Sequence, residues 1–208
     1  MNNRKTKKKP SKQLAVYVLS AKELEPKKAY KLEIFTPKIP SVNVRLIPIR
    51  SGKRWALHPV YRTMKEAFKQ AIMKLDLPTY SPQDFTSLWH FRVYIACFYK
   101  DQRALRRDPD NFLKIIQDGV CVSLLQKLFQ TGDDKNLRNL ALTLEEFPLI
   151  KDDTSLNQAI DSIKSDLPSS FEEEDQLRAH LIARIQASSK QEKLLGAYLN
   201  LALVAIRR

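Results

Sequence analysis

The side chains most able to do chemistry belong to one short acidic motif. Asp108 stands before Pro109 and Asp110, and Lys114 and Asp118 follow at intervals of four residues. In a helix of 3.6 residues per turn, Asp110, Lys114 and Asp118 lie on one face. Mg²⁺ prefers carboxylate oxygens, keeps several waters and adds substrate phosphate oxygens. The motif therefore predicts a metal site for phosphodiester hydrolysis, in which a lysine stabilises the charge that develops on the phosphate.

More charged residues surround this motif. The acidic pair Asp133-Asp134 follows the predicted helix in a turn. If the next strand packs beside the strand that precedes the motif, this turn is expected to come back near the start of the site. Cationic side chains nearby are expected to grip the phosphate backbone of DNA. These are Arg103, Arg106, Arg107, Lys53 and Arg54.

Each acidic residue also has an ordinary structural interpretation. Asp108 before Pro109 is typical of a helix cap, and Asp110 suits the positive end of the helix dipole. Asp110 and Lys114 could form a simple surface ion pair, and Asp133-Asp134 is a common turn sequence. Spacing alone does not decide between these interpretations and a metal site.

The composition favours a partner that carries phosphate. The chain of 208 residues holds 36 Lys and Arg against 23 Asp and Glu, a net charge of +13. Residues 1–12 supply six of these charges and no acid, as a disordered basic arm would. Cys97 and Cys121 stand alone in apolar surroundings, which predicts buried thiols in a reducing compartment. No apolar stretch is long enough to span a bilayer, so we expect a soluble, cytoplasmic protein.

Periodicity predicts an α+β fold, a compact two-layer mixed sheet with helices. The expected strands cover residues 13–20, 30–36, 44–49, 89–99 and 137–147, and the expected helices cover 58–75 and 109–128. We expect strand 89–99 to be buried mainly on one face. After Pro148, residues 151–168 are expected to be partly helical and 171–208 to form an amphipathic helical stretch. The expected organisation is a basic arm (1–12), a nuclease domain (13–148) and a helical C-terminal extension (149–208).

The acidic motif resembles that of the RusA family of Holliday junction resolvases. Asp108-x-Asp110-Asn111-x-x-Lys114-x-x-x-Asp118, with a later Asp-Asp pair opening a strand, follows the family pattern. Residues 40–43, Pro-Ser-Val-Asn, resemble the family's early Pro-Pro-Ser-x-Asn segment. The similarity covers roughly residues 30–148.

This resemblance implies a small α+β homodimer that cuts four-way DNA junctions with Mg²⁺, for which Mn²⁺ could substitute, in recombination and repair. Two-fold symmetry suits paired symmetric nicks. The implied roles are metal binding by Asp108, Asp110 and Asp134 (or Asp133), catalysis by Lys114 with Asp118 in support, and DNA positioning by Asn111. The chain departs from the pattern in having Gly119 after Asp118, a longer segment before the acidic pair, and extra residues at both ends. These departures leave open whether the substrate is a Holliday junction or another branched DNA.

Two other functions stay open. A nuclease of the PD-(D/E)-x-K type would use Pro109-Asp110 with Asp133-x-Lys135. A non-catalytic protein that binds branched DNA would carry the same basic residues with an inactive site. Trp55 and Tyr61 could stack on unpaired bases in any of these proteins, although packing in the core is the more ordinary role for them.

Overall fold

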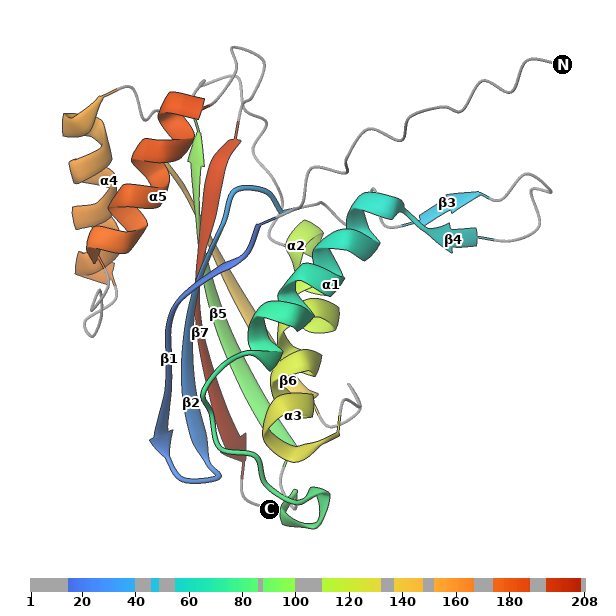
Figure 1. The fold of residues 1–208 in the computed structure, drawn as a ribbon. Helices are drawn as coiled ribbons and strands as arrows, with labels where there is room; N and C mark the ends of the chain where they lie inside the picture. The colour runs from blue at the N-terminus through green and yellow to red at the C-terminus, as the bar shows by residue number, and fades with distance from the viewer. Residues whose placement is uncertain are drawn as a thin grey trace, which may run out of the picture.

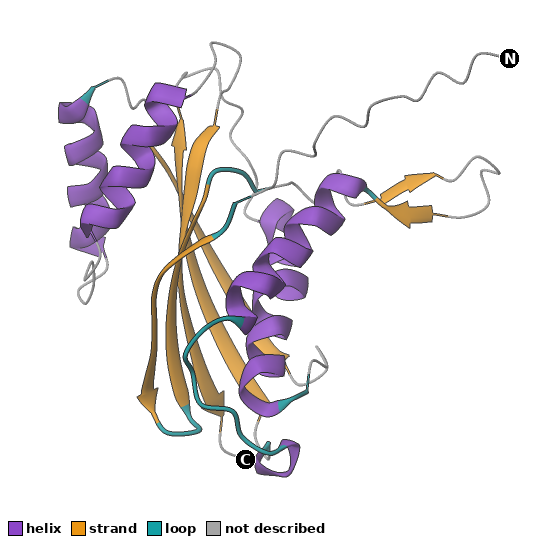
Figure 2. Ribbon diagram, viewed as in Figure 1, coloured by secondary structure: helices purple, strands orange, loops and turns teal. Residues whose placement is uncertain are grey.

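The protein folds as a five-stranded sheet with helices on both faces (Figures 1 and 2). The computed structural model describes residues 15–39, 46–48, 55–85, 88–99, 110–131, 137–147, 152–166, 174–187 and 194–206. Among these residues, no helix is long and apolar enough to cross a membrane. The α+β class expected from the sequence is confirmed.

The sheet is mixed, with one parallel pair. In the order β1-β2-β7-β5-β6, the first four strands pair antiparallel, and β6 pairs parallel with β5. The five strands are β1 (Tyr17–Glu25), β2 (Ala29–Thr36), β5 (Leu88–Tyr99), β6 (Leu137–Phe147) and β7 (Leu194–Ile206). A separate two-stranded ribbon consists of β3 (Leu46–Pro48) and β4 (Trp55–Leu57). The four strands predicted up to residue 99 are all present with shifted ends, and the strand at 137–147 has the predicted bounds.

Helices lie on both faces of the sheet. On one face lie α1 (Pro59–Met73) and a continuous helix made of α2 (Asp110–Ile116), the π-helical turn η3 (Gln117–Cys121) and α3 (Val122–Phe129). On the other face lie α4 (Asp153–Asp166) and α5 (Glu174–Ala187). A short 3₁₀ turn, η2 (Pro82–Asp84), follows α1 in the chain and precedes β5. Both helices predicted before residue 148 are confirmed, as is the helical part of residues 151–168.

The start of α1 follows directly from its sequence. Pro59 occupies the first helical turn, where its missing N–H costs nothing. His58 caps the helix, because its Nδ1 accepts a hydrogen bond from the Val60 amide at 3.2 Å. The apolar positions Met64 and Phe68 then recur at helical spacing and are fully buried against the sheet.

Two hydrophobic clusters hold these layers together. The larger joins α1 and α2–α3 to one face of the sheet, and it includes Cys97 and Cys121, both buried as expected. The smaller joins α4 and α5 to the other face. The expectation that residues 89–99 are buried mainly on one face holds only for the first part of β5, because Ala96 and Phe98 pack in the smaller cluster.

The predicted helical C-terminal stretch is wrong beyond α5. Residues 194–206 form β7, which lies between β2 and β5 in the middle of the sheet. Near its N-terminal end, β7 is covered by helices on both faces, so neither set of alternate side chains meets water. Its sequence is accordingly apolar almost without interruption. Periodicity cannot distinguish such a run from a buried helix. The last described segment is therefore part of the central sheet.

Candidate functional site

The acidic motif opens the long helix on the sheet. α2 begins at Asp110, in agreement with a helix start around Asp108 and Pro109. Asp108 lies outside the described residues, as do the side chains of Asp110 and Asn111. The described part of the motif is therefore the backbone of its first turn and the side chains of Lys114 and Asp118.

Lys114 and Asp118 form a tight, half-buried ion pair. The Lys114 Nζ lies 2.8 Å from Asp118 Oδ1, and the two side chains are 27% and 14% exposed. Lys114 also donates a longer hydrogen bond of 3.5 Å to Gln117 Oε1. The second carboxylate oxygen of Asp118 accepts a hydrogen bond of 3.2 Å from the Tyr61 hydroxyl. Both oxygens of Asp118 thus accept from a donor, and the carboxylate fixes the lysine head group in place.

A π-helical turn places Asp118 beside α1. Within η3, the Val122 amide donates to the carbonyl of Gln117, five residues earlier, which widens the helix locally. Gly119 lets α1 approach closely, since a Cβ there would lie 3.0 Å from Phe68 Cδ2 and 3.6 Å from Lys65 Cα. This close approach explains in steric terms why glycine follows Asp118 in this chain. Such π turns are frequent at functional sites.

The flank of α1 next to this turn is basic. Lys65 and Lys69 are four residues apart, so they lie on one side of the helix, and both are partly buried. The Cα of Lys65 is among the atoms nearest to Gly119. The sequence shows that α1 carries cations outside its apolar stripe, but only the packing of α1 on η3 brings Lys65 beside Gly119, the residue that follows Asp118. Phosphate groups entering here would meet cations from two helices.

Tyr61 packs in the core, and its ring is fully buried. Its hydroxyl nevertheless reaches Asp118, 57 residues away in sequence. No sequence spacing predicts this contact, so sequence reasoning missed the role of Tyr61 at the site. The side chain of Trp55 lies outside the described residues.

The residues that flank the second acidic pair lie far from Asp110. β6 does pack beside β5, as expected, but the pairing is parallel, and Leu137 faces Trp89 at the beginning of β5. Trp89 also contacts Phe129 at the end of α3, with ring centroids 5.2 Å apart. From Asp110 to Phe129 the helix is about 30 Å long, and Figure 1 shows α2 and α3 at opposite ends of the helical layer. The sequence led us to expect that the chain before β6 comes back near the start of the site. Within one chain, this arrangement places the residues on either side of that segment at the opposite end of the helix instead.

The other predicted site residues lie outside the described part of the chain. They are Asp133, Asp134, Arg103, Arg106, Arg107, Lys53 and Arg54. Among the described residues, no three His, Cys, Asp or Glu side chains gather in a way that could hold a metal ion. The Mg²⁺ site expected from the motif therefore depends on carboxylates that lie outside them.

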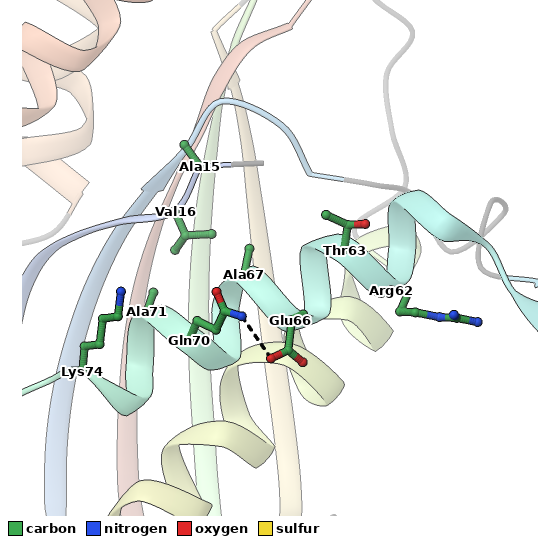
Figure 3. Close-up of a pocket in the computed structure, with 9 residues that line it drawn as sticks. All are labelled: Ala15, Val16, Arg62, Thr63, Glu66, Ala67, Gln70, Ala71 and Lys74. Atoms are coloured by element: carbon green, nitrogen blue, oxygen red, sulfur yellow. Dashed lines mark hydrogen bonds between the residues drawn. The ribbon is translucent and has the colours of Figure 1, made fainter. Parts of the chain in front are cut away.

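A separate groove lies on the opposite flank of α1 (Figure 3). Its volume is about 680 Å³, and small residues on α1, Ala67 and Ala71, line it together with Val16, which directly precedes β1. On its rim, Gln70 donates a hydrogen bond of 3.3 Å to Glu66. Neither Lys114 nor Asp118 lines this groove. The charged residues that line it, Arg62, Glu66 and Lys74, are all exposed, so we place the candidate site at the more buried Lys114 and Asp118 instead.

Comparison with models of known protein families and with curated proteins finds no match to this chain. The similarity to the RusA family therefore rests on the motif residues quoted above. The geometry adds the Lys114–Asp118–Tyr61 arrangement and the basic flank of α1 beside it.

Proposed function

We propose that this protein is a Mg²⁺-dependent endodeoxyribonuclease that cuts branched DNA, four-way junctions above all, as a homodimer. The observation that carries the proposal is the fixed lysine. Lys114 lies on the helix that Asp110 opens, one turn after that acid, and Asp118 holds its head group at 2.8 Å. A lysine kept in one position beside a carboxylate motif is what charge stabilisation at a phosphate requires.

Lys114 has the properties that this role needs. Its side chain is 27% exposed, so a phosphate oxygen can still reach the ammonium group. Asp118 has both oxygens engaged by Lys114 and Tyr61, so it acts as a positioning residue and not as a metal ligand. Asp108 and Asp110, with Asp133 or Asp134 from the other subunit of the dimer, would hold the ion, which when bound would polarise the phosphodiester and orient the attacking water.

The surroundings of the lysine suit a nucleic acid substrate. Lys65 and Lys69 lie on the adjoining flank of α1, where cations can contact phosphates on either side of the scissile bond. The net charge of +13 acts in the same direction at longer range.

The test is cleavage of a synthetic four-way junction with Mg²⁺. We expect wild type to cut it, and Asp110→Asn and Lys114→Met to lower the cleavage rate by about 100-fold or more. Lys127→Met on α3 removes the same charge from the same helix, away from the motif, and serves as the matched control. It should keep nearly the full rate.

Three other results would lead to different conclusions. A wild-type chain that binds the junction and never cuts it with any divalent metal would be a non-catalytic DNA-binding protein. Equal cutting of linear duplex would keep the nuclease and exclude the resolvase. Activity that survives Lys114→Met and requires Lys135 would favour a PD-(D/E)-x-K nuclease.

A further inference from the structure

Two cations continue a row of α1 that begins at the candidate site. Tyr61, Lys65 and Lys69 follow one another at intervals of four residues, so they share one side of the helix. Tyr61, the first of them, donates a hydrogen bond to Asp118, the residue that holds Lys114. The side of α1 that contacts the site therefore carries Lys65 and Lys69 on its next two turns.

Neither of these two lysine side chains has an ion-pair or hydrogen-bond partner within the described part of the chain. The acid next to Lys65 in sequence, Glu66, lines the groove on the other flank of α1, where it accepts from Gln70 (Figure 3). Both oxygens of Asp118 are engaged by Lys114 and Tyr61. The two lysines are partly buried, as a packed aliphatic stem with its charged end at the surface would be. Both cations can thus receive an anionic ligand.

The two long helices of this layer run in the same direction (Figure 1). Tyr61, near the start of α1, meets Asp118, and the Tyr80 amide, beyond the end of α1, donates to the carbonyl of Leu128 near the end of α3. Between these two contacts, the Cα of Lys65 lies beside Gly119. With a rise of about 1.5 Å per residue, the backbone of Lys114 lies about 7 Å before Gly119 along its helix.

This direction places Lys65 and Lys69 on one side of Lys114. Lys69 lies about 6 Å beyond Lys65 toward α3. Asp110, which opens α2, lies on the other side of Lys114. The order along the helical layer is therefore Asp110, Lys114, Lys65 and Lys69.

Such an order suits one strand of a nucleic acid. A scissile phosphate held between the proposed metal ligands and Lys114 would have its neighbours on one side next to Lys65 and Lys69. The phosphates of one strand succeed one another about every 3.4 Å along the duplex axis, so cations about 6 Å apart can each reach a different phosphate. The long lysine stems accommodate the remaining difference in spacing.

We propose that Lys65 and Lys69 bind the two phosphates next to the scissile one, both on the same side of it, so that the cleaved strand follows α1 toward α3. The inference rests on the proposed function and adds the course of the strand to it. Contacts with phosphates fix the register of a nucleic acid without reading its sequence. Lys65 and Lys69 thus determine which phosphate of the strand reaches Lys114.

Neutral phosphates test this course of the strand. Cleavage of a synthetic four-way junction by wild type with Mg²⁺ first locates the scissile phosphate. Two further junctions then carry methylphosphonates at the two phosphates next to it, on the 5′ side in one and on the 3′ side in the other, and fluorescence anisotropy measures their binding in EDTA. On one side only, we expect the neutral pair to weaken wild-type binding by about 10-fold, as the loss of two ion pairs would.

The double variant Lys65→Gln, Lys69→Gln should lose this sensitivity, because glutamine keeps much of the stem and removes the charge. The matched control is Lys74→Gln, Arg92→Gln. Lys74 lines the groove on the other flank of α1, and Arg92 alternates along β5 with residues of the larger cluster, so it lies on the other face of the sheet. The control should respond to the neutral pairs as wild type does, and thermal unfolding checks that both variants are folded.

The possible failures are distinguishable. Neutral pairs that weaken wild type and the Lys65→Gln, Lys69→Gln variant equally on both sides overturn the inference and leave the proposed function intact. The same holds if the variant loses sensitivity on both sides, or if the control loses it as well. A wild-type chain that cuts no junction overturns the proposed function, and the inference with it.

Discussion

Replacing Gly196 by alanine tests the placement of β7 in the centre of the sheet. A Cβ at this position would lie 2.3 Å from Phe35 Cζ and 2.4 Å from Phe35 Cε2, with the carbonyl oxygen of Thr36 at 3.3 Å. Carbon atoms normally approach to about 3.5 Å, so the overlap exceeds about 1 Å. Phe35 is fully buried and lies near Tyr17 and His180, so its ring has little room to move.

The size and the sign of the effect both follow from this contact. Overpacking of a rigid core costs about 1–3 kcal/mol, and the overlap at Gly196 places it at the upper end. Lower backbone entropy of alanine in the unfolded chain returns about 0.5–1 kcal/mol. We therefore expect the free energy of unfolding to fall by about 2 kcal/mol, which lowers Tm by about 4–8 °C in a chain of this size. In an exposed helix, the same substitution would instead stabilise by about 1 kcal/mol.

Urea unfolding followed by circular dichroism measures this difference. The variant Phe35→Leu supplies the control, because a smaller side chain at that position gives the new methyl group room. Gly196→Ala should cost clearly less in the Phe35→Leu background than in wild type, which gives a favourable coupling energy. Stability equal to or above wild type for Gly196→Ala alone would refute both the contact and the strand.

Three further results are expected. Tyr61→Phe should leave the fold intact and lower the rate of junction cleavage several-fold. Asp118 then loses the donor to its Oδ2, so the carboxylate is held less firmly and fixes Lys114 through Oδ1 less well. An unchanged rate would remove Tyr61 from the site. A mixture of the inactive variants Asp110→Asn and Asp134→Asn should recover nicking activity in mixed dimers if Asp133-Asp134 acts at the site of the other subunit. Thr131 and Leu137, which flank this pair, lie at the far end of the helix from Asp110 and favour that outcome over a site within one chain. Burial lowers the pKa of His180 below its ordinary value of 6.5, so the neutral form is favoured on folding and stability should fall as pH drops below about 6.5; His180→Asn should flatten the urea-unfolding profile between pH 7 and 5, and an unchanged profile would contradict this.

Local signals were enough to predict most of the elements. Pro59 and a regular apolar spacing predicted α1, and alternation predicted β5. At the site, the four-residue interval between Lys114 and Asp118 placed both on one helix face, and they form an ion pair there. In these cases a single segment contains all the information that its structure needs.

Long-range arrangement could not be predicted in the same way. The run at 194–206 fits a buried helix as well as a central strand, because burial on two faces removes the alternation that marks a strand. The contact of Tyr61 with Asp118 depends on how α1 crosses η3. The parallel pairing of β6 depends on a helix long enough to carry the chain back to the beginning of β5.

The position of β7 also bears on how the protein is made. β2 and β5 come early in the sequence, yet each has β7 as a neighbour, and β7 follows every other described element. On the ribosome, the hairpin of β1 and β2 and the parallel pair of β5 and β6 therefore emerge as two pieces with open edges. They can join only after residue 206 has been synthesised, so the nascent chain keeps unpaired strand edges until late, a state that invites aggregation and suits assistance by a chaperone.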